Sequence, residues 1–480
     1  MKPFVCTIRS RDQRDDVIDR SVFHSPFAQP YLKVHTLQDH RNSAPLNTRD
    51  THRFGPWTAI AVVIANMIGT GVFTSLGFQL VDIQSVPVLL LLWAIGGIMA
   101  LCGALCYAEL GAALPRSGGE YHYVGTLFHP ALGFVSGWIS ATIGFAAPVA
   151  LVAMTFGIYL QTALPVITPV VAGVLLVILA SLAHVWSRQA SGGLQVVFTS
   201  LKVVVTLAFV LFALSEAGSF QPVSFVPVAS DGALVFGSAF AISLIYVNYA
   251  YTGWNAATYI AGEMADPARH IPRVLAAGTL TVMLLYVALN AVFLLVAPMD
   301  EMVGKVEIGF IAATHLFGER GGELMSLVLA VLLVSTVSAM MLAGPRVLKV
   351  IGEDYPVLRF LAPVNRSGVP AVAIVIQAGL AILLILSGTF ESVLVFTGFT
   401  LSLNTFVTVL GVFVLRKKQD PATFPFRMPL WPLPPLLFLI LTGWTLLYTL
   451  MERPVEGLMG IGIVLTGLLM WWLGQKNKNG

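Results

Sequence analysis

The chain has 480 residues, 57% of them hydrophobic and 11% charged, with a formal net charge of +3 and a mean hydropathy of +0.83. About a quarter of the residues of a soluble globular protein are charged, so this composition excludes a soluble protein and indicates one that crosses a membrane many times. The apolar stretches are also too numerous for a seven-helix receptor.

We predict an all-α integral membrane protein with twelve transmembrane helices. Each apolar stretch is close to or above the roughly 20 residues that a helix needs to span a bilayer, and Pro, Gly and charged residues separate the stretches. The predicted spans are residues 56–81, 86–113, 131–160, 164–186, 192–214, 233–260, 274–298, 322–348, 369–388, 391–415, 428–450 and 455–474.

The chain ends are polar. Residues 1–53 hold nine Lys/Arg and six Asp/Glu without an apolar segment behind a short basic start, which is typical of a largely disordered cytoplasmic tail and not of a cleaved signal peptide. With this tail inside, the inner segments hold 23 of the 27 Lys/Arg, a bias that places both termini in the cytoplasm. We expect a transport core at 54–416, two peripheral helices within 428–474 and a short tail at 475–480.

The first span contains a break at its midpoint. Gly69-Thr70-Gly71 lies inside the apolar run from Trp57 to Leu80, and each glycine costs a helix about 1 kcal/mol relative to alanine. In lipid, open backbone is tolerated only where protein or a cavity satisfies it. We therefore predict a broken helix whose free amide groups face a central site, where the positive end of the following half-helix suits a carboxylate.

The sixth span repeats this feature. Asn248, Thr252, Gly253 and Asn255 lie between apolar flanks, and two interrupted spans in matching positions of two five-span halves indicate an inverted-repeat transporter with its site at the midplane. Backbone carbonyls at the two breaks would face a cation such as an ammonium, so a zwitterion would use both breaks. The alternative is that the glycines only allow close helix packing.

Lys202 is the second strong signal. It lies about nine residues from the inner end of its span, roughly 14 Å deep in a core about 30 Å thick. A charged group at that depth is costly and by default functional, facing the bundle with a partner. Ser335, Thr336 and Ser338 in the eighth span are candidate partners, although such hydroxyls usually bond their own helix backbone.

Three other segments leave alternatives open. Residues 114–123 form either an ordinary inner loop or a short helix folded under the site, and the outer stretch 298–321 holds a short helix that is either a lid or surface packing. Glu109 is either a salt-bridged carboxylate at the end of its span or a functional one. Pro267 and Pro272 are expected to end one helix and start the next.

No cofactor or metal is expected, because no metalloprotease, CxxC, nucleophile-elbow or phosphate-loop motif is present and the histidines lack ligand spacing. Cys102 and Cys106, one helical turn apart in the second span, are expected to be small packing residues, and we expect no structural disulfide. An enzyme is therefore not expected.

Five motifs make the chain resemble the amino acid–polyamine–organocation transporters, most closely the L-type (LAT-like) amino acid transporters and bacterial amino acid permeases. The motifs cover the chain from about Phe54 to Arg416; the last two spans match only in hydrophobicity. They are Ile68-Gly-Thr-Gly-Val-Phe73, Gly103-Ala-Leu-Cys-Tyr-Ala-Glu-Leu-Gly111 with Ser117-Gly-Gly-Glu-Tyr121, Gln195-Val-Val-Phe-Thr-Ser-Leu-Lys202, Tyr249-Ala-Tyr-Thr-Gly-Trp-Asn255 and Glu263-Met-x-x-Pro-x-x-x-Ile-Pro272.

The resemblance implies a LeuT-type fold of two inverted five-helix repeats, here 54–216 and 233–416, plus two peripheral helices. It implies that the substrate carboxylate meets Gly69, Thr70 and Gly71, and that Tyr249 gates the site. The amino group would be held by carbonyls of Met67 or Ile68 and of Tyr249, Ala250 and Thr252. Lys202 would replace a sodium ion of sodium-coupled relatives, with Ser338 near its ammonium.

The sequence also departs from the family. The outer connection around Gln161 to Leu164 lacks the cysteine that joins animal relatives to a heavy chain, so no such partner is expected. Thr252 stands where many L-type members carry glycine, which leaves side-chain preference open.

We therefore expect a sodium-independent secondary transporter of amino acids in the plasma (inner) membrane, working by exchange or with protons, with lipids and its small-molecule substrate as partners and without nucleic acid. The alternatives are a polyamine or amine permease, which should show carboxylates in its pocket, and a non-transporting receptor or scaffold.

Overall fold

The computed structural model describes residues 55–116, 118–186, 192–216, 218, 220–259, 264 and 266–476. The predicted tail at 1–53, with Cys6, and the last four residues of the predicted tail at 475–480 lie outside this part of the chain. The described residues form helices joined by loops, as predicted.

Ten helical segments of the described chain are long and apolar enough to cross a membrane. They are α1 with α2 (Pro56–Met67, Gly71–Gln79), α3 (Val86–Ala113), α5 with η3 and α6 (Pro130–Ile139, Ser140–Gly144, Ala146–Ala163), α7 (Pro169–Trp186), α8 (Gly192–Ser215), α12 (Pro267–Val296), α15 (Glu319–Asp354), α17 (Phe390–Lys418), α18 (Leu433–Glu452) and α19 (Pro454–Lys476).

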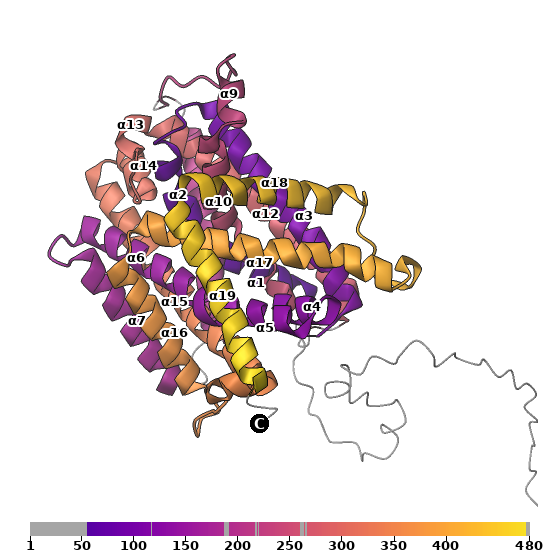
Figure 1. Ribbon diagram of the computed structural model, residues 1–480. Coiled ribbons are helices and arrows are strands. Elements are labelled where there is room, and N and C mark those ends of the chain that lie inside the picture. Colours follow the sequence, from indigo (N-terminus) through magenta and orange to yellow (C-terminus); the bar gives the residue numbers. More distant parts are fainter. Residues whose placement is uncertain are drawn as a thin grey trace, which may run out of the picture. The chain divides into compact units, whose positions relative to one another are not determined.

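Two further predicted spans appear as shorter helices. The sixth is divided into α10 (Ser238–Tyr251) and α11 (Ala256–Tyr259), and the ninth is α16 (Ala371–Ser387). Short helices also lie in the connections: α4 (Glu120–Leu127), α9 (Asp231–Val235), α13 (Met299–Met302), α14 (Ile308–Phe317), η6 (Pro356–Leu361) and η7 (Pro421–Thr423) (Figure 1). Of the segment 114–123, residues 120–123 belong to the short helix α4, and the described residues before them form a loop.

Prolines set several helix ends. α12 begins at Pro267, where the missing amide hydrogen costs nothing because first-turn donors have no intrahelical partner. Pro272 lies inside α12 and does not start it, which corrects the sequence-based expectation. The eleventh predicted span begins at Leu433 and not at residue 428, behind a proline-rich stretch that supplies few helix donors.

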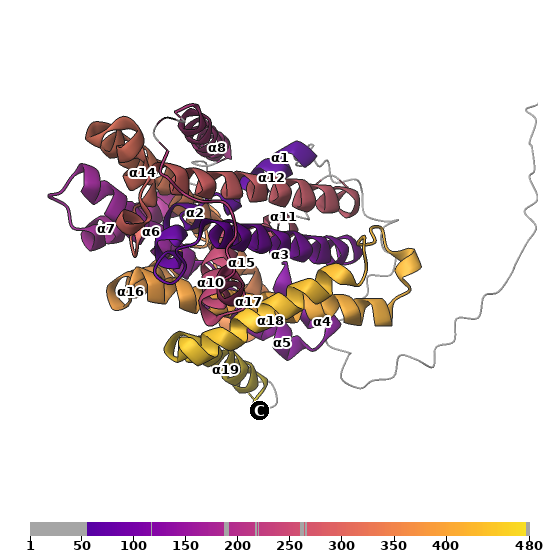
Figure 2. The ribbon, with the colours of Figure 1, turned by 90° about the horizontal axis from the view of Figure 1, so that it is seen from above.

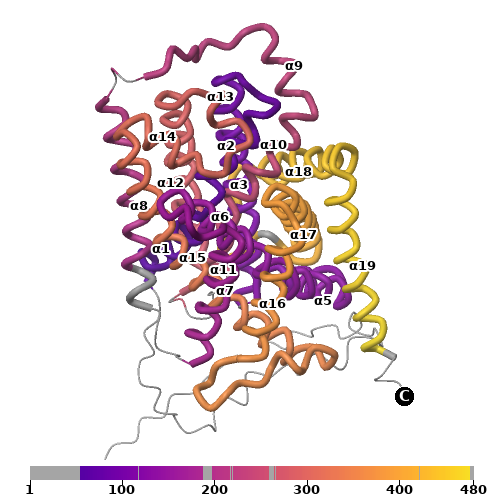
Figure 3. Tube along the Cα trace, turned by 90° about the vertical axis from the view of Figure 1, so that its left-hand side faces the viewer, coloured from indigo at the N-terminus to yellow at the C-terminus, as the bar shows by residue number. Residues whose placement is uncertain are grey.

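The helices pack around the first broken span. α3 lies along α12 and contacts α18 on another side (Figure 2), and α6 packs against α15 and α7. α8 and α19 lie at opposite edges of the described bundle (Figure 3). Large aromatic side chains fill the interior between α3 and α12, including Trp93 and Tyr286, whose rings meet edge to face at 5.8 Å. The two interrupted helices therefore run through the middle of a tightly packed bundle.

Candidate functional site

The first break has the geometry that its glycines predict. α1 ends at Met67 and α2 begins at Gly71, and the residues between them are not helical. The backbone N–H groups of Thr70 and Gly71 donate no hydrogen bond to a described residue. They are the open donors at the N-terminus of α2, where the helix dipole is positive. This end can receive an anion.

The second break supplies acceptors. α10 ends at Tyr251, and Gly253 takes a φ of +105°, a conformation that favours glycine. The Tyr249 carbonyl accepts a hydrogen bond of 2.9 Å from the Thr252 N–H. No described donor bonds the carbonyl oxygens of Ala250 and Thr252. These two oxygens are free to hold a cation.

Glycines bring the two breaks into direct contact. A Cβ on Gly71 would lie 2.7 Å from the Cβ of Ala250 and closer still to its Cα. In return, a Cβ on Gly253 would lie 2.8 Å from the carbonyl carbon of Asn66. Each break therefore needs a glycine where it meets the other, and small-residue contacts of this kind are how membrane helices approach closely.

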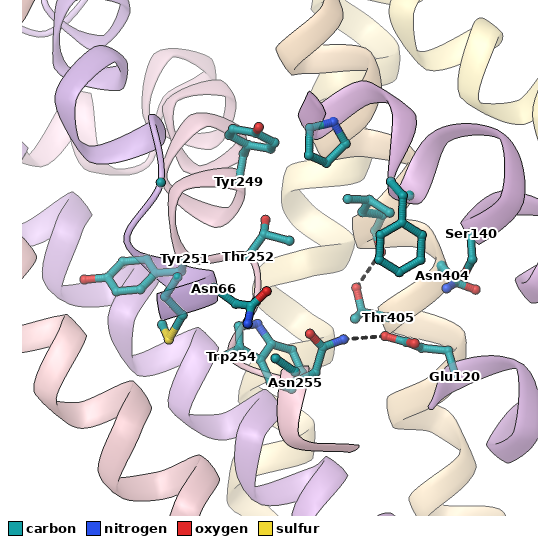
Figure 4. A pocket seen from close by; sticks show the side chains of 18 of the residues that line it. Asn66, Glu120, Ser140, Tyr249, Tyr251, Thr252, Trp254, Asn255, Asn404 and Thr405 are labelled. Carbon is teal, nitrogen blue, oxygen red and sulfur yellow. Dashed lines mark hydrogen bonds between the residues drawn. The ribbon is translucent and has the colours of Figure 1, made fainter. Parts of the chain in front are cut away.

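Both breaks line one cavity of about 440 Å³. Figure 4 shows this pocket with Tyr249 and Thr252 on one side and Asn404 and Thr405 of α17 on the other. The predicted residues that line it are Met67, Gly69, Thr70, Gly71, Tyr249, Ala250 and Thr252. Tyr249 is 8% exposed and lies on the last turn of α10. The structure thus brings seven of the eight predicted substrate residues together.

Two of those residues do not fit their expected roles. The Met67 carbonyl accepts the Gly69 N–H at 2.8 Å and the Tyr286 hydroxyl at 2.5 Å, so both of its lone pairs are used and it has none for an ammonium. Ile68 lines a different, smaller cavity. The carbonyls of Ala250 and Thr252 at the second break are thus the open acceptors of the main cavity.

Lys202 lies beside the first break. It is 5% exposed, and its ammonium donates to the Thr336 hydroxyl at 2.6 Å. Together with Ile68, Gly69 and Thr70 it lines a cavity of about 20 Å³, which is room for about one water molecule. Lys202 thus contacts the back of the break and not the main cavity.

Ser338, which was expected near the Lys202 ammonium, forms its hydrogen bond with another residue. Its hydroxyl lies 2.9 Å from Nε2 of His184 on α7. Thr336 and Ser338 are two residues apart, which is about 200° around a helix, so they face different neighbours. Ser335 bonds the Leu332 carbonyl of its own helix. Thr336 is therefore the residue whose hydroxyl accepts the hydrogen bond from the Lys202 ammonium.

The sequence did not predict that the third span forms part of the cavity wall. Ser140–Gly144 is a π-helical turn, η3, and Ser140, Gly144 and Pro148 line the main cavity. Pro148 has no N–H to bond the Gly144 carbonyl four residues earlier, which explains why the α-helical ladder is interrupted there. A proline inside an otherwise apolar span was the available signal.

An acidic residue also enters the cavity. Glu120, the first residue of α4, is 4% exposed and lines the pocket. Its carboxylate accepts hydrogen bonds from the Asn255 amide at 2.5 Å and the Tyr107 hydroxyl at 3.2 Å (Figure 4). The chain just beyond the second break is thereby tied to α4 and α3.

Glu109 is structural. It is fully buried and holds Arg416 of α17 through two hydrogen bonds of 2.6 and 2.5 Å. The same carboxylate accepts the Met428 N–H at 2.7 Å, and the Arg416 guanidinium lies 3.9 Å from the centre of the Trp431 ring. This cluster joins the end of α3 to α17 and to the segment before α18.

Comparison with known proteins identifies the family of the chain. The family model described as amino acid permease matches residues 54–469. The chain is 27% identical over 432 residues to the Asc-type amino acid transporter 1 of Mus musculus, covering 87% of this chain and 80% of that protein. It is 26% identical over 429 residues to the large neutral amino acids transporter small subunit 2 of Homo sapiens, covering 87% and 79%. It is 27% identical over 426 residues to the serine/threonine exchanger SteT of Bacillus subtilis (strain 168), covering 88% and 96%.

Proposed function

The chain belongs to the amino acid permease family, and we propose that it moves amino acids by alternating access, independently of sodium, either as an exchanger or coupled to protons. It is an amino acid transporter and not an enzyme. One observation carries the mechanism: the two helix breaks, with open donors on one and open acceptors on the other, line the same cavity.

We propose that the first break holds the substrate carboxylate. The N–H groups of Thr70 and Gly71 have no described acceptor and belong to residues that line the cavity at the start of α2, and Gly69 gives the backbone room to turn. Hydrogen bonds from neutral amides to a carboxylate are charge-assisted and about twice as strong as neutral ones. The positive end of the α2 dipole adds to this attraction.

The second break holds the amino group. The carbonyl oxygens of Ala250 and Thr252 can each accept one ammonium hydrogen, and the second lone pair of the Tyr249 carbonyl can accept a third. Tyr249 itself stands beside these groups, and we propose that its ring gates the bound amino acid. A molecule that lacks the carboxylate would leave the N–H groups of the first break without an acceptor. A molecule that lacks the amino group would leave the carbonyls of the second break without a donor.

Lys202 supplies the fixed charge behind the first break. Its ammonium is held by Thr336 and lies against the small cavity at Gly69 and Thr70. An ammonium group at this place makes a second cation there unfavourable, which supports sodium-independent transport. Movement of α8 relative to α15 would break or re-form the hydrogen bond between Lys202 and Thr336.

The proposed architecture is a LeuT-type 5+5 inverted repeat. Ten segments meet the length for a span, and counting the divided α10–α11 helix and the 17-residue α16 gives twelve. The proposed repeats are 54–216 and 233–416, followed by α18 and α19. We further propose a place in the plasma (inner) membrane with both termini cytoplasmic and without a disulfide-linked heavy chain.

An amine permease is the second candidate, because Glu120 places a carboxylate in the cavity. Counterflow into liposomes separates the two. Purified protein is reconstituted with internal unlabelled amino acid, and uptake of labelled amino acids and of polyamines is measured with and without sodium and a pH gradient. We expect uptake of amino acids that is unchanged by sodium. Uptake of polyamines alone, or a strict requirement for sodium, would overturn the proposal.

A further inference from the structure

The wall opposite the breaks carries a polar side chain that forms no hydrogen bond with any residue that the structure describes. Asn404 of α17 lines the main cavity and is 8% exposed. In Figure 4 its amide stands among the cavity side chains without a hydrogen bond to any residue drawn. Across the described chain, its side chain bonds no other residue.

The placement of Asn404 follows from the path of α17. Gly398 lets this helix approach α10, because a Cβ there would lie 2.7 Å from the Ile245 side chain. Leu401 lies against Gly144 of η3, 3.9 Å from where a Cβ would stand. From Gly398 to Thr405 the helix therefore forms a continuous wall of the cavity, and Asn404 lies on it about 9 Å beyond Gly398 at 1.5 Å per residue.

A buried amide in a transmembrane helix is costly unless it finds a partner. The neighbouring Thr405 satisfies its hydroxyl within its own helix, on the Leu401 carbonyl at 2.6 Å. Thr408, one turn further, does the same on the Asn404 carbonyl at 2.9 Å. Asn404 is unlike them, because its donors and acceptor are directed to the cavity.

The charge of the lining narrows what can bind there. Two charged residues of the described chain line this cavity, Glu120 and Arg346. Glu120 is already bonded by Asn255 and Tyr107, and Arg346 is solvent-exposed. A cationic substrate side chain would thus find no open carboxylate in the pocket, and solvent and salt weaken the attraction of the exposed Arg346 for an anionic one. A neutral hydroxyl or amide would find the amide of Asn404.

We propose that Asn404 is a specificity-determining residue that hydrogen-bonds the side chain of the transported amino acid, so that the preferred substrates are neutral amino acids with a hydroxyl or amide group. This rests on the proposed function, with the substrate backbone held at the two breaks. An amide both donates and accepts, and therefore suits either group. An aliphatic side chain of the same shape would cover Asn404 and leave its amide without a hydrogen-bond partner.

Threonine and valine test this most sharply, because they have the same shape and differ by a hydroxyl and a methyl group. Uptake kcat/KM is measured for both in proteoliposomes. We expect the wild-type protein to favour threonine by about tenfold, the effect of one well-placed hydrogen bond. Asn404→Leu should bring the ratio close to one by lowering threonine uptake while valine uptake persists.

Thr408→Val is the matched control. It lies on the same helix, does not line the cavity and loses only a bond to its own backbone, so its threonine-to-valine ratio should equal that of the wild type. If the leucine variant does not fold, Asn404→Ser replaces it in the test. Its hydroxyl can still form a hydrogen bond, so this variant should retain part of the preference for threonine over valine.

The outcomes separate the two proposals. A wild-type protein that transports valine as well as threonine, or an Asn404→Leu variant with an unchanged ratio, overturns the role of Asn404 and leaves amino acid transport standing. A wild-type protein that transports no amino acid overturns the proposed function itself.

Discussion

Gly71 packs directly against Ala250, so that the start of α2 and the end of α10 meet backbone to backbone. These residues lie 179 positions apart in the sequence, and their contact is what places amide donors and carbonyl acceptors in one cavity. The reciprocal approach of Gly253 to Asn66 holds the breaks together from the other side.

The first prediction concerns this contact. Gly71→Ala would put a methyl group into the Ala250 backbone and over the proposed carboxylate site. Overpacking of this kind costs about 1–3 kcal/mol, so we expect uptake to fall by about tenfold or more in liposomes with equal amounts of protein. Gly379→Ala on α16 is the control, because nothing lies within 4 Å of a Cβ at that position. Equal uptake by both variants would contradict the close contact.

The second prediction concerns Lys202. Lys202→Ala removes the charge behind the first break, and Thr336→Val removes its hydrogen-bond partner. We expect the first to lower uptake by about tenfold or more. The second should lower it by a smaller factor, because it keeps the ammonium and removes only one of its hydrogen-bond partners. Ser338→Ala, two residues along α15, should have little effect on uptake. Normal transport by folded Lys202→Ala protein would remove Lys202 from the mechanism.

The third prediction concerns stability at Glu109. Glu109→Gln leaves the Arg416 guanidinium buried beside a neutral group, and breaking a buried pair costs about 3–5 kcal/mol. We expect a melting temperature several degrees lower in detergent. Glu353→Gln breaks the exposed pair of Glu353 with Lys349, 3.3 Å apart, which contributes at most about 0.5 kcal/mol. If both variants have the same melting temperature as the wild type, the Glu109 cluster does not stabilise the protein.

The fourth prediction concerns Tyr286. Its hydroxyl fixes the last carbonyl of α1 at Met67, so Tyr286→Phe frees that carbonyl and loosens the break. A net loss of about 1 kcal/mol corresponds to a few-fold drop in uptake. Tyr448→Phe on α18 is the control, since the Tyr448 ring packs on Trp444 and its hydroxyl bonds no described residue. A Tyr286→Phe variant with unaltered uptake would show that this bond does not shape the site.

The backbone frame of the site could be predicted from the sequence because glycines inside apolar runs carry their own signal. Gly69, Gly71 and Gly253 all lie where the helices are broken. The burial of Lys202 could also be predicted, by counting residues along its span. These features depend on local sequence and on the thickness of a bilayer.

Residues whose role depends on helix rotation and on neighbours could not be predicted. Ser338 was expected beside Lys202 and lies instead against His184, because a shift of two residues turns a side chain to another face. The Met67 carbonyl was expected to hold an ammonium, but Tyr286, more than two hundred residues away, already occupies it. The place of Asn404 in the cavity could not be predicted, because it depends on how α17 packs against its neighbours.

The central claim is that one zwitterion is held by both breaks, and competition by matched analogues tests it most directly. Uptake of a transported amino acid is measured against the same amino acid, its methyl ester, which lacks the carboxylate, and its α-hydroxy acid, which lacks the amine. We predict strong competition by the free amino acid and competition about tenfold or more weaker by each analogue, because each leaves one break unpaired. Equal competition by the ester or by the hydroxy acid would contradict the account.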